Sequence, residues 1–248
     1  ISEFFETTTR VLAERHVEVL AEGVGQCLSV GVEEGDSVKK GQVLAQLDRK
    51  ELEAALGQSQ VNVQQTKYQM EKAREQHAKG ILSAFEAENA KFVHEQAVAA
   101  VNVQQVRIGK QTITAPIDGV VTKRNLQPGQ MVAAGVPAFS IVDPASYILP
   151  INPPEKELAR LQAGQEAKVS IDAMPGQEIT ATVRRINPAV DPLSGTIKVT
   201  LDFAEADRAL LREAAFARVR LIMTTHQNAL LVPKDVIIEE NARRFLMV

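Results

Sequence analysis

The chain has 248 residues, and its 28 Lys and Arg residues against 31 Asp and Glu residues give a formal net charge of −3. This balance gives no electrostatic reason to bind a nucleic acid. Hydrophobic residues make up 45% and charged residues 24%, a globular composition that excludes a disordered chain, and no apolar run approaches the roughly 18 residues that span a bilayer.

The segment that follows residue 14 contains a pattern that is repeated 94 positions later. Three glycines in each copy hold matched places: Gly25, Gly35 and Gly41 in the first, and Gly119, Gly129 and Gly135 in the second. Their spacing predicts tight turns with positive φ between about four short strands per copy. Because neither copy can bury both of its faces alone, residues 15–48 and 112–143 are expected to pack into one small lipoyl-like sandwich.

Residues 49–111, between the two copies, lack proline and are rich in Ala, Gln, Glu and Lys, which favours helix. Intervals of four and three residues predict a coiled-coil seam in the first helix through Leu52, Leu56, Ser59, Val63, Thr66, Met70, Ala73 and His77. A second helix is predicted from Ala84 to about Gly109, facing the first through Phe92 or Val93, Ala97, Ala100 and Val103. The segment therefore predicts a helical hairpin with its tip at residues 80–83, reaching roughly 45 Å from the sandwich.

The residues after Asp143 change to the period-two alternation of a β domain. Strands are expected over 147–151, 167–171, 178–186, 196–203 and 217–223. One short helix is expected between Asn152, as N-cap with Pro153 in the first helical position, and Gly164. These elements predict a small closed β-barrel over residues 144–232, and residues 233–248 are expected to begin a further domain.

No motif of a known catalytic class is present in the sequence. There is no G-x-S-x-G turn, no H-E-x-x-H helix and no phosphate-binding Gly-Lys-Ser/Thr loop. The four histidines, at positions 16, 77, 94 and 226, are far apart, and folding the hairpin about residue 83 would place His94 level with residue 72. We therefore expect a protein that is not an enzyme and that holds neither a cofactor nor a metal.

The split repeat resembles the lipoyl or biotinyl domain, and its interruption by a hairpin makes the chain similar to the periplasmic adaptors, or membrane fusion proteins, of tripartite resistance-nodulation-division efflux pumps. The resemblance runs through GVEEGDSVKKGQVLAQLD, the hairpin, TITAPIDGVVTKRNLQPGQMV, INPAVDPLSGTIKV and ALLVPKDVI. It covers nearly the whole chain. It implies an elongated, mainly β, multidomain protein in which residues 1–14 return to the barrel or membrane-proximal region and residues 233–248 begin the membrane-proximal domain.

The resemblance also implies partners and a place of action. Such adaptors link an inner-membrane transporter to an outer-membrane channel and assemble into a ring, by resemblance a hexamer, for the export of drugs or other small toxic compounds. The place is the periplasm of a Gram-negative bacterium, with attachment to the inner membrane through partners or an N-terminal anchor. Channel docking is implied for the hairpin tip, here Lys72, Gln76, Lys79, Gly80, Ile81, Leu82, Ser83 and Glu86.

Two departures and three alternatives accompany this interpretation. Lys72 and Gln76 stand where the family carries arginine and leucine, and residues 213–216 stand where it carries a Pro-Gly-Met-like turn. Gly80 and Ser83 could simply end one helix and cap the next. The chain could instead be an adaptor of an ABC exporter or type I secretion system, or a carrier with lipoate or biotin on a lysine such as Lys50.

Overall fold

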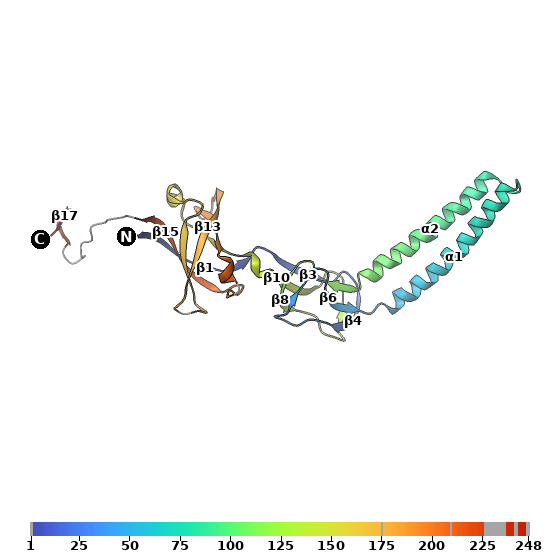
Figure 1. Cartoon of the computed structure of the whole chain (residues 1–248), viewed down its shortest axis with the longest axis horizontal. Helices are drawn as coiled ribbons and strands as arrows, with labels where there is room; N and C mark the ends of the chain where they lie inside the picture. Colours follow the sequence, from blue (N-terminus) through green and yellow to red (C-terminus); the bar gives the residue numbers. More distant parts are fainter. Residues whose placement is uncertain (1, 175, 209, 226–236, 241–242, 247–248) are drawn as a thin grey trace. The chain divides into compact units, whose positions relative to one another are not determined.

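The computed structural model describes residues 2–174, 176–208, 210–225, 237–240 and 243–246. The chain divides into two compact units, Arg15–Asp143 and the pair of segments Ile1–Glu14 and Pro144–Val248. The fold is mainly β with one hairpin of two long helices (Figure 1), which confirms the predicted fold class. Among the described helices, none is both long and apolar enough to cross a membrane.

The unit Arg15–Asp143 contains a sandwich of two four-stranded sheets. The strands of the first half are β3 (His16–Leu20), β4 (Gly25–Val30), β5 (Ser37–Val38) and β6 (Val43–Leu47), and those of the second half are β7 (Thr112–Thr114), β8 (Gly119–Arg124), β9 (Met131–Val132) and β10 (Pro137–Val142). One sheet has the order β3-β10-β8-β5 and the other the order β7-β6-β4-β9. Each sheet therefore takes two strands from each half of the repeat.

The two sheets are equivalent in register as well as in strand order. In one sheet Ser140 of β10 pairs with Glu18 of β3, and in the other Gln46 of β6 pairs with Thr112 of β7, so each residue has its counterpart 94 positions away. The core between the sheets is apolar, with Leu44, Leu47, Leu126, Phe139 and Ile141 fully buried. The sequence repeat thus corresponds to an approximate two-fold arrangement in which neither half has a sheet of its own.

The six repeat glycines serve two different purposes. Gly35, Gly41, Gly129 and Gly135 have φ between 84° and 96°, as expected for turns that only glycine adopts without strain. The predicted turn was wrong for Gly25 and Gly119, which begin strands β4 and β8, although Gly25 does have a positive φ, of 159°. A Cβ atom on Gly119 would lie 2.3 Å from the carbonyl oxygen of Val142. Glycine is needed there because two strands approach closely, which local sequence does not indicate.

Helices α1 (Lys50–Ala78) and α2 (Ala84–Gly109) form the hairpin and pack against each other. The predicted α1 seam is confirmed, because its members are buried or half-buried, except for His77, which is exposed. The predicted α2 face was wrong apart from Ala97. Phe92, Val93, Ala100 and Val103 are exposed, and the covered residues of α2 are Ala87, Ala90, His94, Ala97, Val101, Gln104 and Ile108.

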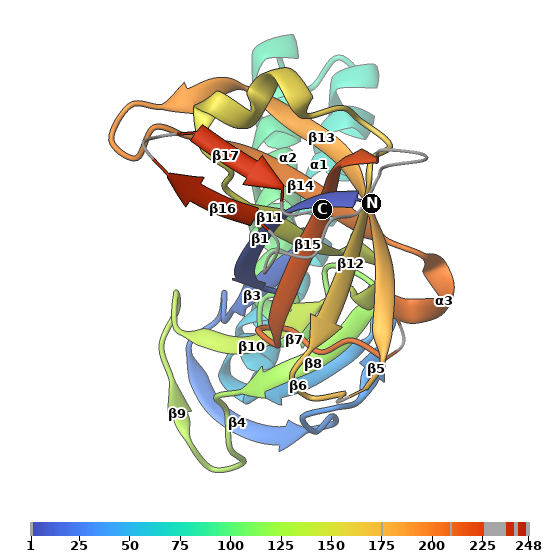
Figure 2. The same cartoon turned by 90° about the vertical axis from the view of Figure 1, so that its left-hand side faces the viewer.

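The second unit is a β-barrel built on a seven-stranded sheet of order β1-β15-β12-β13-β14-β11-β2. Its strands are β1 (Ser2–Arg10), β2 (Leu12–Ala13), β11 (Tyr147–Ile151), β12 (Glu166–Ile171), β13 (Glu178–Asp191), β14 (Thr196–Phe203) and β15 (Phe216–Thr225). Figure 2 shows β1, β15, β12 and β13 side by side. Because β1 and β2 lie at opposite edges of the sheet but are separated only by the buried Val11, the N-terminal segment closes the barrel.

This unit also contains short helices. They are the 3-10 helices η1 (Pro144–Ser146) and η2 (Glu155–Arg160) and the α-helix α3 (Glu205–Arg208). Helix η1 precedes β11, and the other two connect barrel strands. The helix predicted from Asn152 was wrong in start and type, because η2 starts only at Glu155 and Pro154 is extended with ψ of 149°. The steric cause is the Pro153-Pro154 pair, since a residue that precedes proline disfavours the helical region.

Ala214 has φ of 62°, the only left-handed non-glycine residue among those that the structure describes. It lies between α3 and β15, in the segment 213–216. Its N–H donates to the carbonyl of Val11 at 2.9 Å, and the N–H of Val11 donates to the carbonyl of Ala215 at 2.9 Å. These two hydrogen bonds hold the turn to the closing segment, at a conformational cost of about 1 kcal/mol that glycine would avoid.

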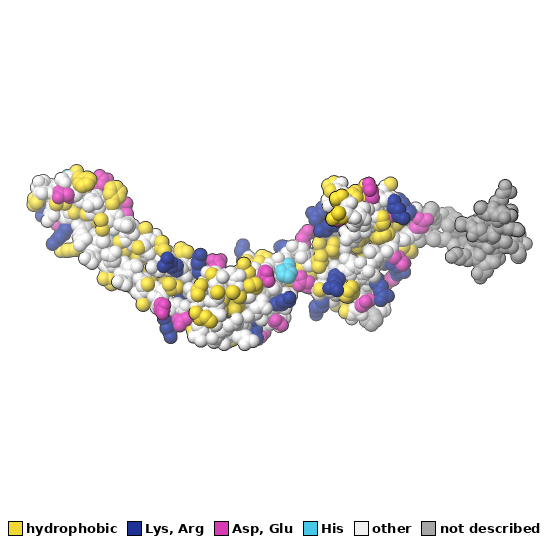
Figure 3. All heavy atoms as spheres, turned by 180° about the vertical axis from the view of Figure 1, so that it is seen from behind, with side chains coloured by type: hydrophobic (Ala, Val, Ile, Leu, Met, Phe, Trp, Pro, Cys, Tyr) yellow, Lys and Arg dark blue, Asp and Glu magenta, His cyan; other side chains and the backbone are white. Residues whose placement is uncertain are grey.

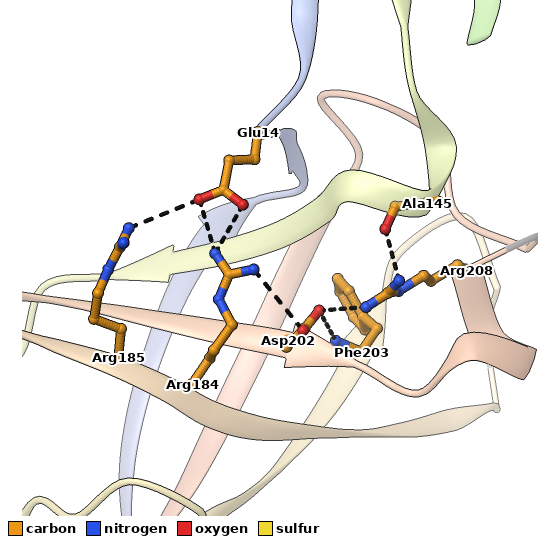
Figure 4. A network of polar contacts seen from close by, with 7 residues as sticks. All are labelled: Glu14, Ala145, Arg184, Arg185, Asp202, Phe203 and Arg208. Atoms are coloured by element: carbon orange, nitrogen blue, oxygen red, sulfur yellow. Dashed lines mark hydrogen bonds and ion pairs between the residues drawn. The ribbon is translucent and has the colours of Figure 1, made fainter. Parts of the chain in front are cut away.

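Ion pairs and hydrogen bonds tie the ends of this unit's two segments to the barrel (Figure 4). Arg184 of β13 donates to both carboxylate oxygens of Glu14, at 2.8 and 2.9 Å. Arg208 of α3 donates to Asp202 at 2.7 Å and to the carbonyl of Ala145 at 2.6 Å. Arginines of the barrel therefore hold both the last residue of the first segment, Glu14, and a residue near the start of the second, Ala145.

Beyond residue 225, the described residues form β16 (Ile237–Glu240) and β17 (Arg243–Leu246), which pair antiparallel. The predicted end of the barrel at 232, the start of the next domain at 233 and His226 lie outside the described residues.

Candidate docking site at the hairpin tip

The tip begins where α1 ends at Ala78. The N–H of Gly80 donates to the carbonyl of His77 at 2.9 Å, and the N–H of Ile81 donates to the carbonyl of Gln76 at 2.9 Å. Gly80 has φ of 73°. These features form a Schellman motif, which satisfies the last carbonyls of the helix and reverses the chain at once.

A side chain of α1 then fixes the loop. The ring of His77 contacts the carbonyl oxygen of Leu82 at 2.9 Å through Nδ1. Because a carbonyl oxygen only accepts, Nδ1 carries the proton and donates. His77 therefore ties the last turn of α1 to the residue that precedes Ser83.

Ser83 is the N-cap of α2 and forms a capping box with Glu86. The Ser83 hydroxyl accepts the N–H of Glu86 at 3.2 Å, and Glu86 Oε2 accepts from the Ser83 hydroxyl at 2.7 Å and from the Ser83 N–H at 3.1 Å. The hydroxyl, and then the backbone N–H, lower the pKa of the Glu86 carboxyl. Gly80 and Ser83 thus have the structural roles that the sequence left open, and these roles leave docking possible.

Replacing Ser83 by alanine is expected to raise the pKa of Glu86 toward its ordinary value, because the hydroxyl donor to the carboxylate is lost. A carboxyl whose pKa is lowered by folding stabilises the fold above its unfolded pKa, and that stabilisation is lost as the pH falls through the folded pKa. The start of α2 should therefore loosen at acidic pH in the unmodified chain. NMR titration of the Glu86 carboxyl carbon measures the change. Ser59→Ala, which removes a hydroxyl donating to Ala55 within α1, should leave this pKa unaltered.

The two lysines among the predicted docking residues are already engaged within the chain. The Lys72 ammonium lies 5.0 Å from the centroid of the Tyr68 ring, one turn back along α1. Lys79 pairs with Glu75. Of the predicted docking residues, those from Lys79 to Glu86 lie at the tip, whereas Lys72 and Gln76 lie on the last turns of α1.

Sequence reasoning missed two residues of this site. The first is Phe85, which is 81% exposed on the first turn of α2; Ile81, which was predicted, stands four residues earlier and is 71% exposed. His77 was assigned to the seam but binds the loop instead. Phe85 could have been found from its place two residues after the N-cap, where a phenylalanine lies outside the 3.5-residue seam.

The histidines of the hairpin lie apart. Nδ1 of His94 lies 3.2 Å from the hydroxyl of the buried Thr66, so His94 is level with residue 66 and not with residue 72 as predicted. The reversal is centred near residue 80 because the Schellman motif turns the chain there. Within the described residues, no three His, Cys, Asp or Glu side chains gather as they would around a metal ion.

Two family models match the chain. The model described as "RND MFP, barrel-sandwich hybrid domain" matches residues 15–144, more than half of the chain, and the model described as "CusB-like, beta-barrel domain" matches residues 149–225.

Two known proteins are similar to this chain over most of its length. An uncharacterized protein of Haemophilus influenzae is 26% identical over 231 residues, covering 93% of this chain and 60% of the relative. Multidrug resistance protein MdtA of Klebsiella pneumoniae is 26% identical over 260 residues, covering 96% and 63%. The chain thus spans about three-fifths of the length of these relatives.

Among solved structures, a MacA-MexA chimeric protein that contains the Pseudomonas aeruginosa MexA α-hairpin domain is similar in fold. Its TM-score is 0.78 at 23% identity, with 98% of this chain and 86% of that chain covered.

Proposed function

Because this chain belongs to the membrane fusion proteins of resistance-nodulation-division (RND) efflux systems, we propose that it is a periplasmic adaptor between an inner-membrane transporter and an outer-membrane channel. The proposed transporter is of the RND class, and the proposed cargo is drugs or other small toxic compounds. The proposed place is the periplasm of a Gram-negative bacterium, at the inner membrane. The adaptor acts by assembly and without catalysis.

The insertion of the hairpin between two matched halves carries this proposal. The first half ends with β6 at Leu47 and the second begins with β7 at Thr112, and the connection consists of α1 and α2. A lipoyl or biotinyl carrier needs a tight turn there, with an exposed lysine. Lys50 is instead the first residue of α1. The connection that would present a modified lysine presents a two-helix arm, which suits contact with another protein.

The outer face of α2 supports self-association. Phe92, Val103 and Val106 are all more than half exposed. At 3.6 residues per turn they share one side of the helix, opposite to the seam that includes His94 and Ala97. An exposed apolar stripe on a hairpin that already has its seam favours packing against a neighbouring copy. Side-to-side contacts of this kind close rings, here proposed as a hexamer.

We further propose a division of labour along the chain. The barrel, residues 144–232 with 1–14, and the domain that begins at 233 engage the transporter. The sandwich, residues 15–48 and 112–143, forms the ring, and residues 49–111 reach the channel through the tip, residues 80–83.

A photo-crosslinking amino acid at Leu82 of the full-length protein tests the docking role. After irradiation of intact cells, mass spectrometry is expected to identify an outer-membrane channel as the captured partner. The same probe at the exposed Glu166 of the barrel should not capture it. Capture of a cytoplasmic enzyme subunit, together with a mass adduct on a lysine of the purified chain, would establish the carrier alternative. Absence of any adduct at Leu82 would remove the tip assignment.

A further inference from the structure

We propose that the tip binds the channel through an apolar pair, Ile81 and Phe85, on a loop whose shape His77 fixes, and that the binding surface on the channel is apolar and uncharged. This inference rests on the proposed function and specifies which residues of the tip make the contact. Of the tip residues that the family resemblance indicates, it keeps Ile81 and moves the contact away from Lys72 and Gln76.

Ile81 is exposed because of the residue that stands five positions before it. In a Schellman motif, an apolar side chain at the position of Ile81 packs on the residue whose carbonyl accepts its N–H. Here that residue is Gln76, which offers a polar side chain. Ile81 therefore remains 71% exposed on a loop held by backbone hydrogen bonds.

Phe85 is the most exposed phenylalanine among those whose exposure the structure describes, at 81%. It lies two residues after the N-cap Ser83, so the capping box fixes its backbone. By contrast, Leu82 is half-buried. Figure 3 shows hydrophobic side chains at the free end of the hairpin. Two large apolar side chains on a fixed loop match the aromatic and aliphatic anchors that dominate protein interfaces.

Three charged side chains near this pair are engaged within the chain. Lys79 pairs with Glu75, Glu86 is held in the capping box, and Lys72 lies over Tyr68. Burying such charged groups at an interface costs desolvation free energy, whereas burying the apolar pair gains free energy. An apolar channel surface opposite Ile81 and Phe85 gains this free energy without a charged partner for the groups already engaged.

His77 makes the loop a fixed shape before binding. Its ring donates to the carbonyl of Leu82, between Ile81 and the N-cap. A loop that is ordered in advance loses less conformational freedom on binding, so affinity rises. His77 is a positioning residue, since it acts through the loop and makes no contact with the channel in this proposal.

The test uses full-length protein in intact cells with a photo-crosslinking amino acid at the exposed Ala84. Ile81→Ser and Phe85→Ser are each expected to reduce channel capture about tenfold. Val61→Ser is the matched control, because Val61 is 64% exposed on α1 away from the tip, and it should leave capture unaltered. His77→Ala should reduce capture about threefold, and His77→Asn, whose amide places an N–H near that of Nδ1, should restore it.

The outcomes separate the inference from the proposed function. If the parent protein captures no channel, the docking role itself fails. If both serine variants capture the channel as well as the parent protein does, the proposal that Ile81 and Phe85 make the contact is wrong, while the docking role stands. Capture of a second copy of the adaptor in place of the channel would assign the pair to self-association and overturn the inference. The positioning role of His77 is supported if His77→Ala reduces channel capture and His77→Asn restores it. It is overturned if His77→Ala captures the channel as well as the parent protein does.

Discussion

Replacing Gly119 by alanine is expected to destabilise the unit Arg15–Asp143 by about 3 kcal/mol or more, a loss that lowers its unfolding temperature by roughly 10 °C. The new Cβ would lie 2.3 Å from the carbonyl oxygen of Val142 and 2.9 Å from Cγ2 of Ile141. Val142 pairs with Val120 in the same ladder, so its carbonyl cannot withdraw unless β8 and β10 separate. Differential scanning calorimetry of the chain measures the shift.

Two other glycines provide comparisons for this result. Gly25 holds the equivalent place in the first half, where a Cβ would lie 3.2 Å from the carbonyl oxygen of Asp48, and its φ of 159° strains any other residue, so Gly25→Ala should also be destabilising. Gly57 lies inside α1 with open space around it, and Gly57→Ala should stabilise the hairpin by about 0.5–1 kcal/mol. Equal stability of Gly119→Ala and the parent chain would show that the two strands do not approach as described.

Replacing Phe139 by alanine is expected to cost about 4 kcal/mol, because it leaves a cavity in the sandwich core. Phe139 is fully buried on β10 and is the largest of the fully buried side chains. Its counterpart in the first half is Ala45, also buried, so no second aromatic ring fills the space from the equivalent position. Calorimetry should show a lower transition for this unit.

Phe92→Ala is the matched control, since Phe92 is 57% exposed on α2 of the same unit. A change within about 0.5 kcal/mol is expected for it. If the two phenylalanine variants lost the same stability, then Phe139 would not be the core residue that the sandwich geometry requires.

The helical hairpin shows where sequence reasoning succeeded and failed. The α1 seam was found because its residues follow a strict alternation of four and three. On α2 the facing set was predicted as Phe92 or Val93 with Ala97, Ala100 and Val103. Of these only Ala97 is covered, and the covered positions also include Ala87 and Ala90. Two antiparallel helices need small side chains where their backbones approach, so the largest apolar residues were left for the outside.

The capping signals at the tip were local and therefore readable. Gly80 and Ser83 end α1 and begin α2 as their residue types indicate. The contact of His77 with Leu82 was not readable, because it depends on how sharply the loop turns. The exposure of Ile81 depends in turn on that same loop and on Gln76, so docking residues could be listed from the sequence but not ranked.

The sequence by itself determined the repeat, the hairpin between its halves, the barrel alternation and hence the fold class, because these depend on residue type and spacing along the chain. The tertiary structure alone decided that each sheet combines strands from both halves, and that Gly25 and Gly119 serve close approach while Gly35 and Gly129 serve turns. The family resemblance had placed residues 1–14 in the barrel or membrane-proximal region, and the structure decided that this segment pairs with both β15 and β11 and so closes the barrel. The physical reason is that pairing partners, close approaches and exposed faces are set by residues distant in sequence.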